Sequence, residues 1–230
     1  WGAIALANPA LVLFLPFAGL WVVGRDLRAL WAATAGGLVF LAILSPWMIR
    51  NYFVFHHFVP LRANFGAELY LGNGPGATGL LMEYQHPHQD LLQLQQYAAL
   101  GEYRYAKIRG QAAMATIRAN PGLFARNSLK RLYFFWFGVP NGAPLWTSLP
   151  RAVNFGTLTV VSLLGLVVIL RRRMAGAWLF ALAFLTVPLM YYFVTVHARF
   201  RHPLEPLMAV LGVFLFHAAE RGQGKQRAAG

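Results

Sequence analysis

The sequence PWMIRNYFVFHHFVPLRANFGAELYLGNGPGATG, residues 46–79, is where an apolar part of the chain gives way to polar, glycine-rich sequence. The apolar run ends on Arg50 and Asn51, and the residues that follow are rich in Gly, Pro and Asn. This change predicts that Arg50 lies where a membrane helix emerges into water. We expect the segment after it to form the rim of a site facing away from the cytoplasm.

The composition of the whole chain predicts an integral membrane protein. Hydrophobic residues make up 58% and charged residues 12%, and the mean hydropathy is +0.49. The charged share is about half that of soluble domains, and the apolar residues come in long uncharged blocks. The net charge of +13 would suggest nucleic acid in a soluble protein. Here the basic residues cluster at the ends of apolar blocks, which favours membrane lipids as partners and no nucleic acid.

The apolar blocks predict an all-α integral membrane protein with about five transmembrane helices. The predicted spans cover residues 2–23, 29–49, 152–170, 174–196 and 203–219. Asn8-Pro9, Pro16 and Pro188 are expected to kink their spans. The chain starts at Trp1 inside an apolar run, which is typical of a piece of a longer protein.

Between the second and third spans, roughly a hundred residues of mixed polarity predict a mainly helical external domain. Its first part reads as ordered loop with a short strand at 68–71, and residues 90–120 read as a helix broken near Gly101. Asn120-Pro121 predicts the start of another helix, with Arg126, Lys130 and Arg131 early and aromatics late. That helix is expected to lie on the bilayer with its basic side chains snorkelling, where they could also line a lipid-phosphate entrance.

The distribution of basic residues predicts the orientation. Segments 24–28, 171–173 and 220–230 are basic and fall on the cytoplasmic side. The predicted organisation is two transmembrane helices at 1–49, a periplasmic loop domain with an interfacial helix at 50–150, three transmembrane helices at 151–219 and a cytoplasmic tail at 220–230. The short external link 197–202 breaks the positive-inside rule, since it holds two arginines and two histidines.

This link is the first candidate binding segment. Arg199 and Arg201, with His197 and His202, suit a phosphate clamp because guanidinium groups bind phosphate oxygens in a bidentate fashion. Ordinary anchoring to lipid headgroups is the alternative. All five predicted span interiors lack Asp, Glu, Lys and Arg, which argues against transport through the membrane.

The second candidate is the segment after the second span. Arg50 and Asn51, with Arg62, Asn64 and Asn73 further along, offer donors suited to a sugar or a phosphate. Arg50 can equally cap the last turn of its own helix.

Carboxylates and histidines of the external domain complete the set of candidates. Glu68 is the acid best placed to bind sugar hydroxyls or a metal, with a structural hydrogen bond as the alternative. The pairs His56-His57 and His86/His88 lack a third ligand at a telling spacing, so we expect surface histidines and no metal site.

Three stretches carry a resemblance to a known family: the quoted segment 46–79, NPGLFARNSLKRLYFFWFGVP at 120–140 and HARFRHPLEPLMAV at 197–210. Together they resemble the C-terminal half of bacterial GT-C glycosyltransferases of the family 39 type, which are related to protein mannosyltransferases and lipid A aminoarabinose transferases. The resemblance covers nearly the whole chain. Its most specific parts are the PW-x-x-RN-Y span exit and the R-F-R-x-P-x-x-P link.

The resemblance implies an inverting glycosyltransferase of the cytoplasmic (inner) membrane and cell envelope that uses a polyprenyl-phosphate-linked sugar donor and a lipid, glycan or protein acceptor. It assigns the donor phosphate to Arg199 and Arg201, and the cavity rim to Arg50 and Asn51. The family's catalytic Asp matches no residue here, so it is expected upstream and no catalytic residue is assigned. Many members bind a divalent metal, but no cofactor is evident and no complete set of ligands is found.

Two other functions remain open from the sequence. An O-antigen ligase or polymerase also combines spans with a long external loop that bears Arg and His. A non-catalytic lipid-binding membrane module would need no sugar site at all.

Overall fold

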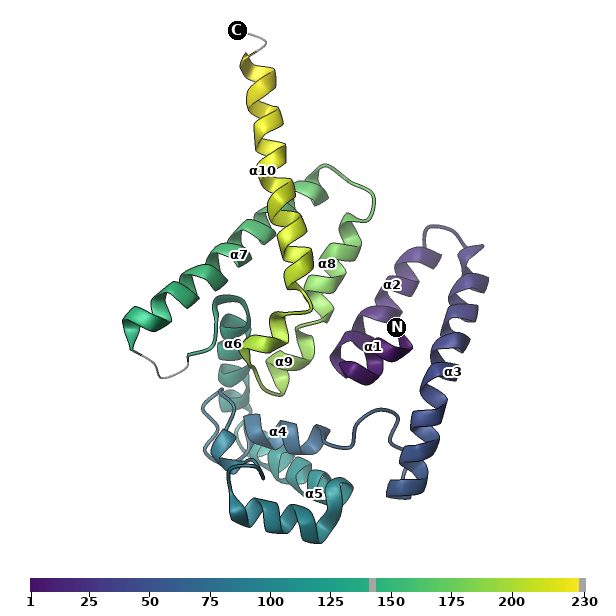
Figure 1. Ribbon diagram of the computed structural model, residues 1–230, viewed down its shortest axis with the longest axis vertical. Helices are drawn as coiled ribbons and strands as arrows, with labels where there is room; N and C mark the ends of the chain where they lie inside the picture. The colour runs from purple at the N-terminus through teal and green to yellow at the C-terminus, as the bar shows by residue number, and fades with distance from the viewer. Residues whose placement is uncertain (141–143, 228–230) are drawn as a thin grey trace. The chain divides into compact units, whose positions relative to one another are not determined.

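The computed structural model describes residues 1–140 and 144–227, and every regular element in these ranges is a helix (Figure 1). The chain forms two compact units. Unit 1 comprises Trp1–Arg131 together with Thr186–Val196, and unit 2 comprises Leu132–Leu185 together with the chain from His197 onward. Helix α6 (Pro121–Phe137) begins in unit 1 and ends in unit 2.

The first apolar block of unit 1 is broken into three short helices. They are α1 (Gly2–Ala7), the 3-10 helix η1 (Pro9–Leu13) and α2 (Phe14–Val23). Asn8 interrupts the block with an extended backbone and its side chain accepts from the N–H of Ala10, as a cap does. The kink predicted at Asn8-Pro9 is therefore confirmed.

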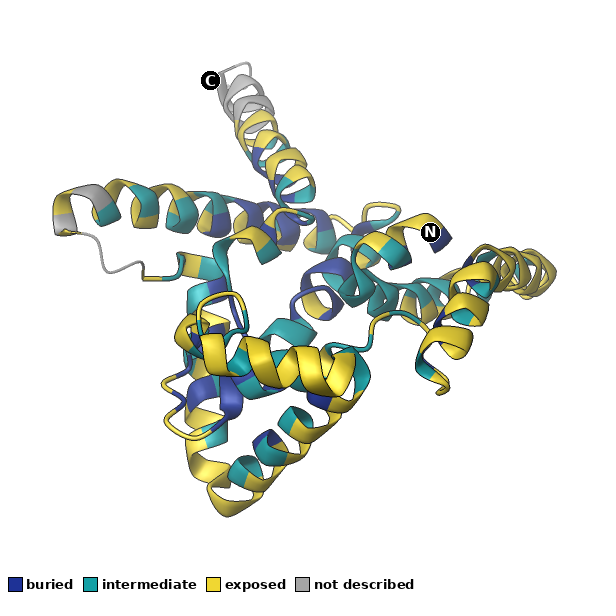
Figure 2. Ribbon diagram, turned by 60° about the horizontal axis from the view of Figure 1, so that its bottom comes forward, coloured by how far each residue is buried: buried dark blue, intermediate teal, exposed yellow. Residues whose placement is uncertain are grey.

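Helix α3 (Ala29–Phe55) is the longest apolar helix of unit 1. It is long and apolar enough to cross a membrane, and only 6% of its most apolar window is buried (Figure 2). Leucines and aromatic residues along it face outward, among them Trp31, Leu38 and Phe53. In a soluble protein such a helix would lie in the core, because exposed apolar surface of this extent is unfavourable in water.

The polar part of unit 1 is built by α4 (Phe65–Asn73), the short 3-10 turn η2 (Glu83–Gln85) and α5 (Leu91–Ala119). The strand predicted at 68–71 is wrong, because these residues lie inside α4. Leu69 and Leu71 are buried there, and Leu69 packs in a small core with Ala113 of α5 and Val194. The glycines around α4 suggested extended chain, whereas Gly66 actually serves a close crossing with Gly110 of α5.

Helix α5 follows the sequence closely. Asp90 caps it by accepting from the N–H groups of Leu92 and Gln93, and the break predicted near Gly101 is found at that residue, with φ 72° and ψ 162°. Only glycine adopts this conformation without strain. The residue after Asn120 opens α6, as predicted.

Unit 2 is organised by α7 (Leu145–Arg171), α8 (Ala177–Thr186) and α10 (Glu205–Arg227). Helix α7 crosses α10 at Gly165, where an added Cβ would collide with the carbonyl of Leu211. Leu204, just before α10, and Met208 and Leu211 in α10 are buried. The part of α7 from Ser148 to Arg171 is the second helical segment that is long and apolar enough to span a membrane.

The remaining predicted spans are shorter helices. The fourth is divided at Pro188 into α8 and α9 (Leu189–Phe193), which confirms the predicted kink, and the fifth lies within α10. Apolar helices at Pro9–Val23, Ala177–Phe193 and Glu205–Ala219 fall below the length of a full span. The described residues therefore contain two helices of spanning length, where five were predicted.

Candidate functional site

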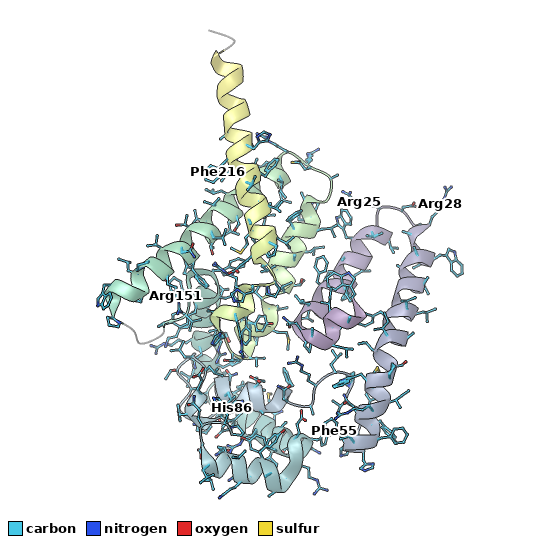
Figure 3. The ribbon with its side chains drawn as sticks, in the orientation of Figure 1. Arg25, Arg28, Phe55, His86, Arg151 and Phe216 are labelled. Atoms are coloured by element: carbon cyan, nitrogen blue, oxygen red, sulfur yellow. The ribbon has the colours of Figure 1, made fainter. Side chains whose placement is uncertain are left out.

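A pocket of about 420 Å³ lies in unit 1 between α4, the turn before α5, and α5 itself. Its polar lining combines two carboxylates, two imidazoles, one guanidinium, an amide and three phenols. These belong to Glu68, Glu102, His86, His88, Arg109, Asn64, Tyr70, Tyr97 and Tyr105. Figure 3 labels His86, which lies in the turn between α4 and α5.

The break at Gly101 gives α5 two arms that both line the pocket. Tyr97 comes from the first arm, and Glu102, Tyr105 and Arg109 come from the second. The Tyr105 hydroxyl donates to Gln93 Oε1 at 3.1 Å, and its ring meets that of Tyr97 edge-on at 5.4 Å. These contacts between the arms fix the wall of the pocket.

Arg109 is positioned by neutral groups. Its Nη2 donates to Gln96 Oε1 at 3.1 Å, and its guanidinium lies over the rings of Tyr70 at 4.5 Å and Tyr105 at 5.3 Å. Cation–π contacts of this kind hold the charge without neutralising it. The guanidinium of Arg109 therefore places a positive charge on the α5 wall of the pocket.

The two acids of the pocket have no ion-pair partner among the described residues. Glu68 Oε1 accepts a long hydrogen bond of 3.3 Å from Asn64 Nδ2. Burial and the nearby charge of Glu102 raise the pKa of Tyr97 above its ordinary value, so this phenol stays a neutral donor. In a chain with 20 basic residues, two carboxylates left unpaired in one pocket are free to accept hydrogen bonds from a ligand.

Arg131 of α6 is fully buried, and its hydrogen-bond acceptors among the described residues are all neutral. It donates to the carbonyls of Gly72, Gly79 and Phe193 and to Asn73 Oδ1. Burial lowers its pKa to about 10, so it remains charged at neutral pH. The snorkelling predicted for Arg131 is wrong, because its guanidinium joins the end of α4, the glycine-rich loop and the end of α9.

Two of the nine residues proposed from sequence, Asn64 and Glu68, line the pocket. Three others hold backbone in unit 1. Asn51 is buried and donates to the carbonyls of Val59 and Leu61. Asn73 donates to the carbonyls of Leu69, Phe193 and Val194. Arg62 donates to the carbonyl of Ala7.

Arg50 is exposed at the end of α3. It donates to Asn51 Oδ1 at 3.0 Å and lies over the ring of Trp47 at 5.1 Å. It is not among the residues that line the α4–α5 pocket.

The link 197–202 belongs to unit 2, where it forms the 3-10 helix η3 (Ala198–Arg201). Arg201 is buried, and its Nη1 donates to Phe155 O, Trp136 O and Thr159 Oγ1 while its Nε pairs with Glu205 at 3.3 Å. Arg201 therefore ties the link to α6 and α7.

Arg199 and His202 are the exposed members of the link. His202 Nδ1 lies 2.9 Å from Glu205 Oε2, and the guanidinium of Arg199 lies 5.6 Å from the ring of Phe200. Of the two arginines predicted to clamp a phosphate, Arg199 is exposed and can reach a ligand, whereas Arg201 is buried.

Sequence reasoning missed most of the pocket. Residues 94 and 97 lie at helical spacing on the first arm of α5, and residues 102, 105 and 109 do so on the second. Periodicity could have placed each set on one face of its own arm, but it could not have brought the two arms together. The described residues contain no cluster of three metal-ligating side chains. Comparison of the chain with protein-family models, curated proteins and solved structures found no match.

Proposed function

We propose that this chain is the donor-binding part of an inverting glycosyltransferase that uses a polyprenyl-phosphate-linked sugar at the outer face of the cytoplasmic membrane. The observation that carries the proposal is the pocket of acids and tyrosines on a chain whose long apolar helix α3 is exposed. A soluble donor would need no such helix, and a simple lipid-binding module would need no such pocket.

The lining of the pocket suits a sugar ring. Unpaired carboxylates accept hydrogen bonds from hydroxyl groups, and hydrogen bonds to charged groups are about twice as strong as neutral ones. Tyrosine faces pack against the apolar side of a ring. The volume of about 420 Å³ lies in the range of small-molecule sites.

The apolar helices would hold the pocket at the membrane surface. In this proposal the three shorter apolar helices also cross or enter the bilayer, giving about five spans, with the α4–α5 region on the external side. Membrane lipids and the polyprenyl chain of the donor would then meet the exposed faces of α3 and its neighbours. The acceptor is a lipid, a glycan or a protein.

Inverting transfer needs a base for the acceptor and a cation for the departing phosphate. The resemblance assigns the donor phosphate to Arg199, which is exposed in the link of unit 2, and Arg201 holds that link in place. The base is assigned to no residue of this sequence, so the proposal is tested by binding rather than by turnover.

The test is binding of undecaprenyl-phosphate-glucose and undecaprenyl-phosphate-mannose to the full chain in lipid nanodiscs. Glu68→Gln and Glu102→Gln should each weaken binding about tenfold or more, because a hydrogen bond to a charged group contributes about 1.5–3 kcal/mol. Asp26→Asn is the control, since Asp26 is an exposed acid in the turn between α2 and α3 and lies outside the pocket lining.

Three outcomes would count against the proposal. Equal affinity for undecaprenyl phosphate with and without sugar would leave the pocket without a role in recognition. Equal binding of phosphatidylglycerol would favour the lipid-binding module. Unchanged affinity in both pocket variants would contradict the assignment of the sugar to this pocket.

A further inference from the structure

Two histidines on the rim of the α4–α5 pocket share one short contact. His86 and His88 flank Pro87 in the turn before α5, and all three line the pocket. Their Nδ1 atoms lie 2.6 Å apart, and their ring centroids lie 4.4 Å apart at an angle of 63°. The backbone N–H of His88 also donates to His86 Nδ1, over 3.2 Å.

Taken together, these contacts favour one tautomer for each ring. Two nitrogens 2.6 Å apart need a single hydrogen between them, because two would repel and none would leave lone pair against lone pair. His86 Nδ1 already accepts from the backbone, so it is the acceptor of both contacts. The hydrogen between the rings therefore belongs to His88 Nδ1, and neutral His86 carries its own hydrogen on Nε2.

We propose that the His86–His88 pair is a proton-operated switch of the pocket, closed while His88 Nδ1–H donates to His86 Nδ1 and opened when acid protonates His86 Nδ1 itself. In the closed state the pair fixes the turn at 86–88 against the pocket. A proton taken up at His88 Nε2 would leave this hydrogen bond in place, but a proton on His86 Nδ1 places N–H against N–H across 2.6 Å and separates the rings. The turn then moves, and the pocket loses part of its rim.

The charged groups around the pair come from every element of the pocket. Glu68 of α4 and Glu83 of η2 favour protonation of His86, whereas burial and His88 oppose it. Glu102 and Arg109 face the same pocket from α5, with Tyr70, Tyr97 and Tyr105 as neutral phenols. Burial and His88 outweigh the acids and lower the pKa of His86 below its ordinary 6.5.

The direction of the pH effect follows. Between pH 6.5 and the lower pKa of folded His86, the unfolded chain binds more protons than the folded one. The closed state is therefore complete at neutral pH and is lost as the pH falls through the pKa of folded His86. The switch rests on the proposed function only in assuming that the pocket holds a donor; the protonation of the pair does not depend on it.

The first experiment follows the histidines directly in the full chain. Proton–nitrogen correlation spectra of ¹⁵N-histidine-labelled protein in nanodiscs are recorded from pH 8 to pH 5. We expect His86 as the Nε2–H form at pH 8, titrating below 6.5. In His88→Ala its pKa should move upward, whereas His217→Gln, on α10, should leave it unchanged.

The second experiment measures binding of undecaprenyl-phosphate-glucose at pH 7.5 and pH 5.5. Wild-type affinity should fall about tenfold or more at the lower pH, and His88→Ala and His88→Gln should lose most of this dependence. An Nδ1–H form of His86, titration at the ordinary value, or a pH dependence retained in both variants would overturn the switch. Absence of binding at both pH values would contradict the proposed function instead, and the spectra would still decide the state of the pair.

Discussion

Arg131 shows how a single side chain can hold several segments of unit 1 together. Its guanidinium donors reach the end of α4, the loop at Gly79 and the carbonyls of Tyr192 and Phe193. No carboxylate pairs with it in the described part of the chain. A buried charge without a counter-charge is costly, so its neutral hydrogen bonds must all be made to offset that cost.

Replacing Arg131 tests whether its hydrogen bonds hold these segments together. Arg131→Ala should destabilise the protein by at least about 3 kcal/mol, because each buried acceptor left without a donor costs about 1–3 kcal/mol. The measurement is thermal unfolding in detergent or nanodiscs. Arg131→Lys should recover only part of the loss, since an ammonium group lacks the planar fork.

Lys130→Ala is the matched control for this change. The neighbouring lysine has one exposed hydrogen bond, from Nζ to the carbonyl of Thr78 at 3.1 Å. Its removal should cost about 1 kcal/mol or less. Equal losses for Arg131→Ala and Lys130→Ala would contradict the view that Arg131 joins the segments of unit 1.

At the scale of elements, the pocket depends on how closely α4 crosses α5. Gly66 and Gly110 face each other at the crossing, and an added Cβ on Gly66 would come within 3.1 Å of Gly110 Cα and collide with the carbonyl of Ala106. The backbone cannot yield as a flexible side chain would. Gly66 and Gly110 are therefore needed because they let the two helix backbones approach closely. Neither glycine is needed for a left-handed backbone conformation.

Gly66→Ala should consequently push the two helices apart and cost about 1–3 kcal/mol, the usual range for overpacking. Donor affinity should fall with it, because Asn64 and Glu68 sit on the α4 wall of the pocket. Unfolding curves and the binding assay provide the two readouts. Gly122→Ala in α6 is the control, since nothing lies within 4 Å of its added Cβ and alanine favours helix.

At the scale of the whole molecule, the exposed apolar surface of α3 supports the proposal that this helix lies in a membrane. Leu38 and Leu41 of α3 are 64% and 55% exposed, in the middle of a helix of 27 residues. A helix of this length and composition is stable when lipid covers it. The expressed chain should therefore sediment with membranes and resist alkaline carbonate extraction.

Charge placed in the middle of α3 tests this expectation. Leu38→Arg combined with Leu41→Arg should sharply reduce insertion, because each arginine costs about 2.5–3.5 kcal/mol at the centre of a span. Leu27→Arg, in the turn before α3, should insert normally although Leu27 is 79% exposed. Release of the wild-type chain by carbonate would contradict the membrane assignment.

The sequence alone indicated most of the helices, although not α4, and several of the helix ends. Asp90, Gly101, Pro121 and Pro188 act through their own backbone and side-chain chemistry within a few residues, so the cap, the breaks and the helix start could be read locally. Apolar block length likewise identified α3 and residues 148–171. The strand assigned to 68–71 failed because the local glycine content was taken as loop, while packing against α5 makes α4 a helix.

The tertiary structure decided which polar residues face a ligand and which face backbone. Asn51, Asn73, Arg131 and Arg201 looked like surface donors in the sequence, yet each is buried and bonded to carbonyl groups. Glu102, Tyr105 and Arg109 join Glu68 only because the break in α5 turns its second arm onto the pocket. Local sequence specifies what a side chain can bind, but its partners are brought to it by contacts between residues far apart in the chain.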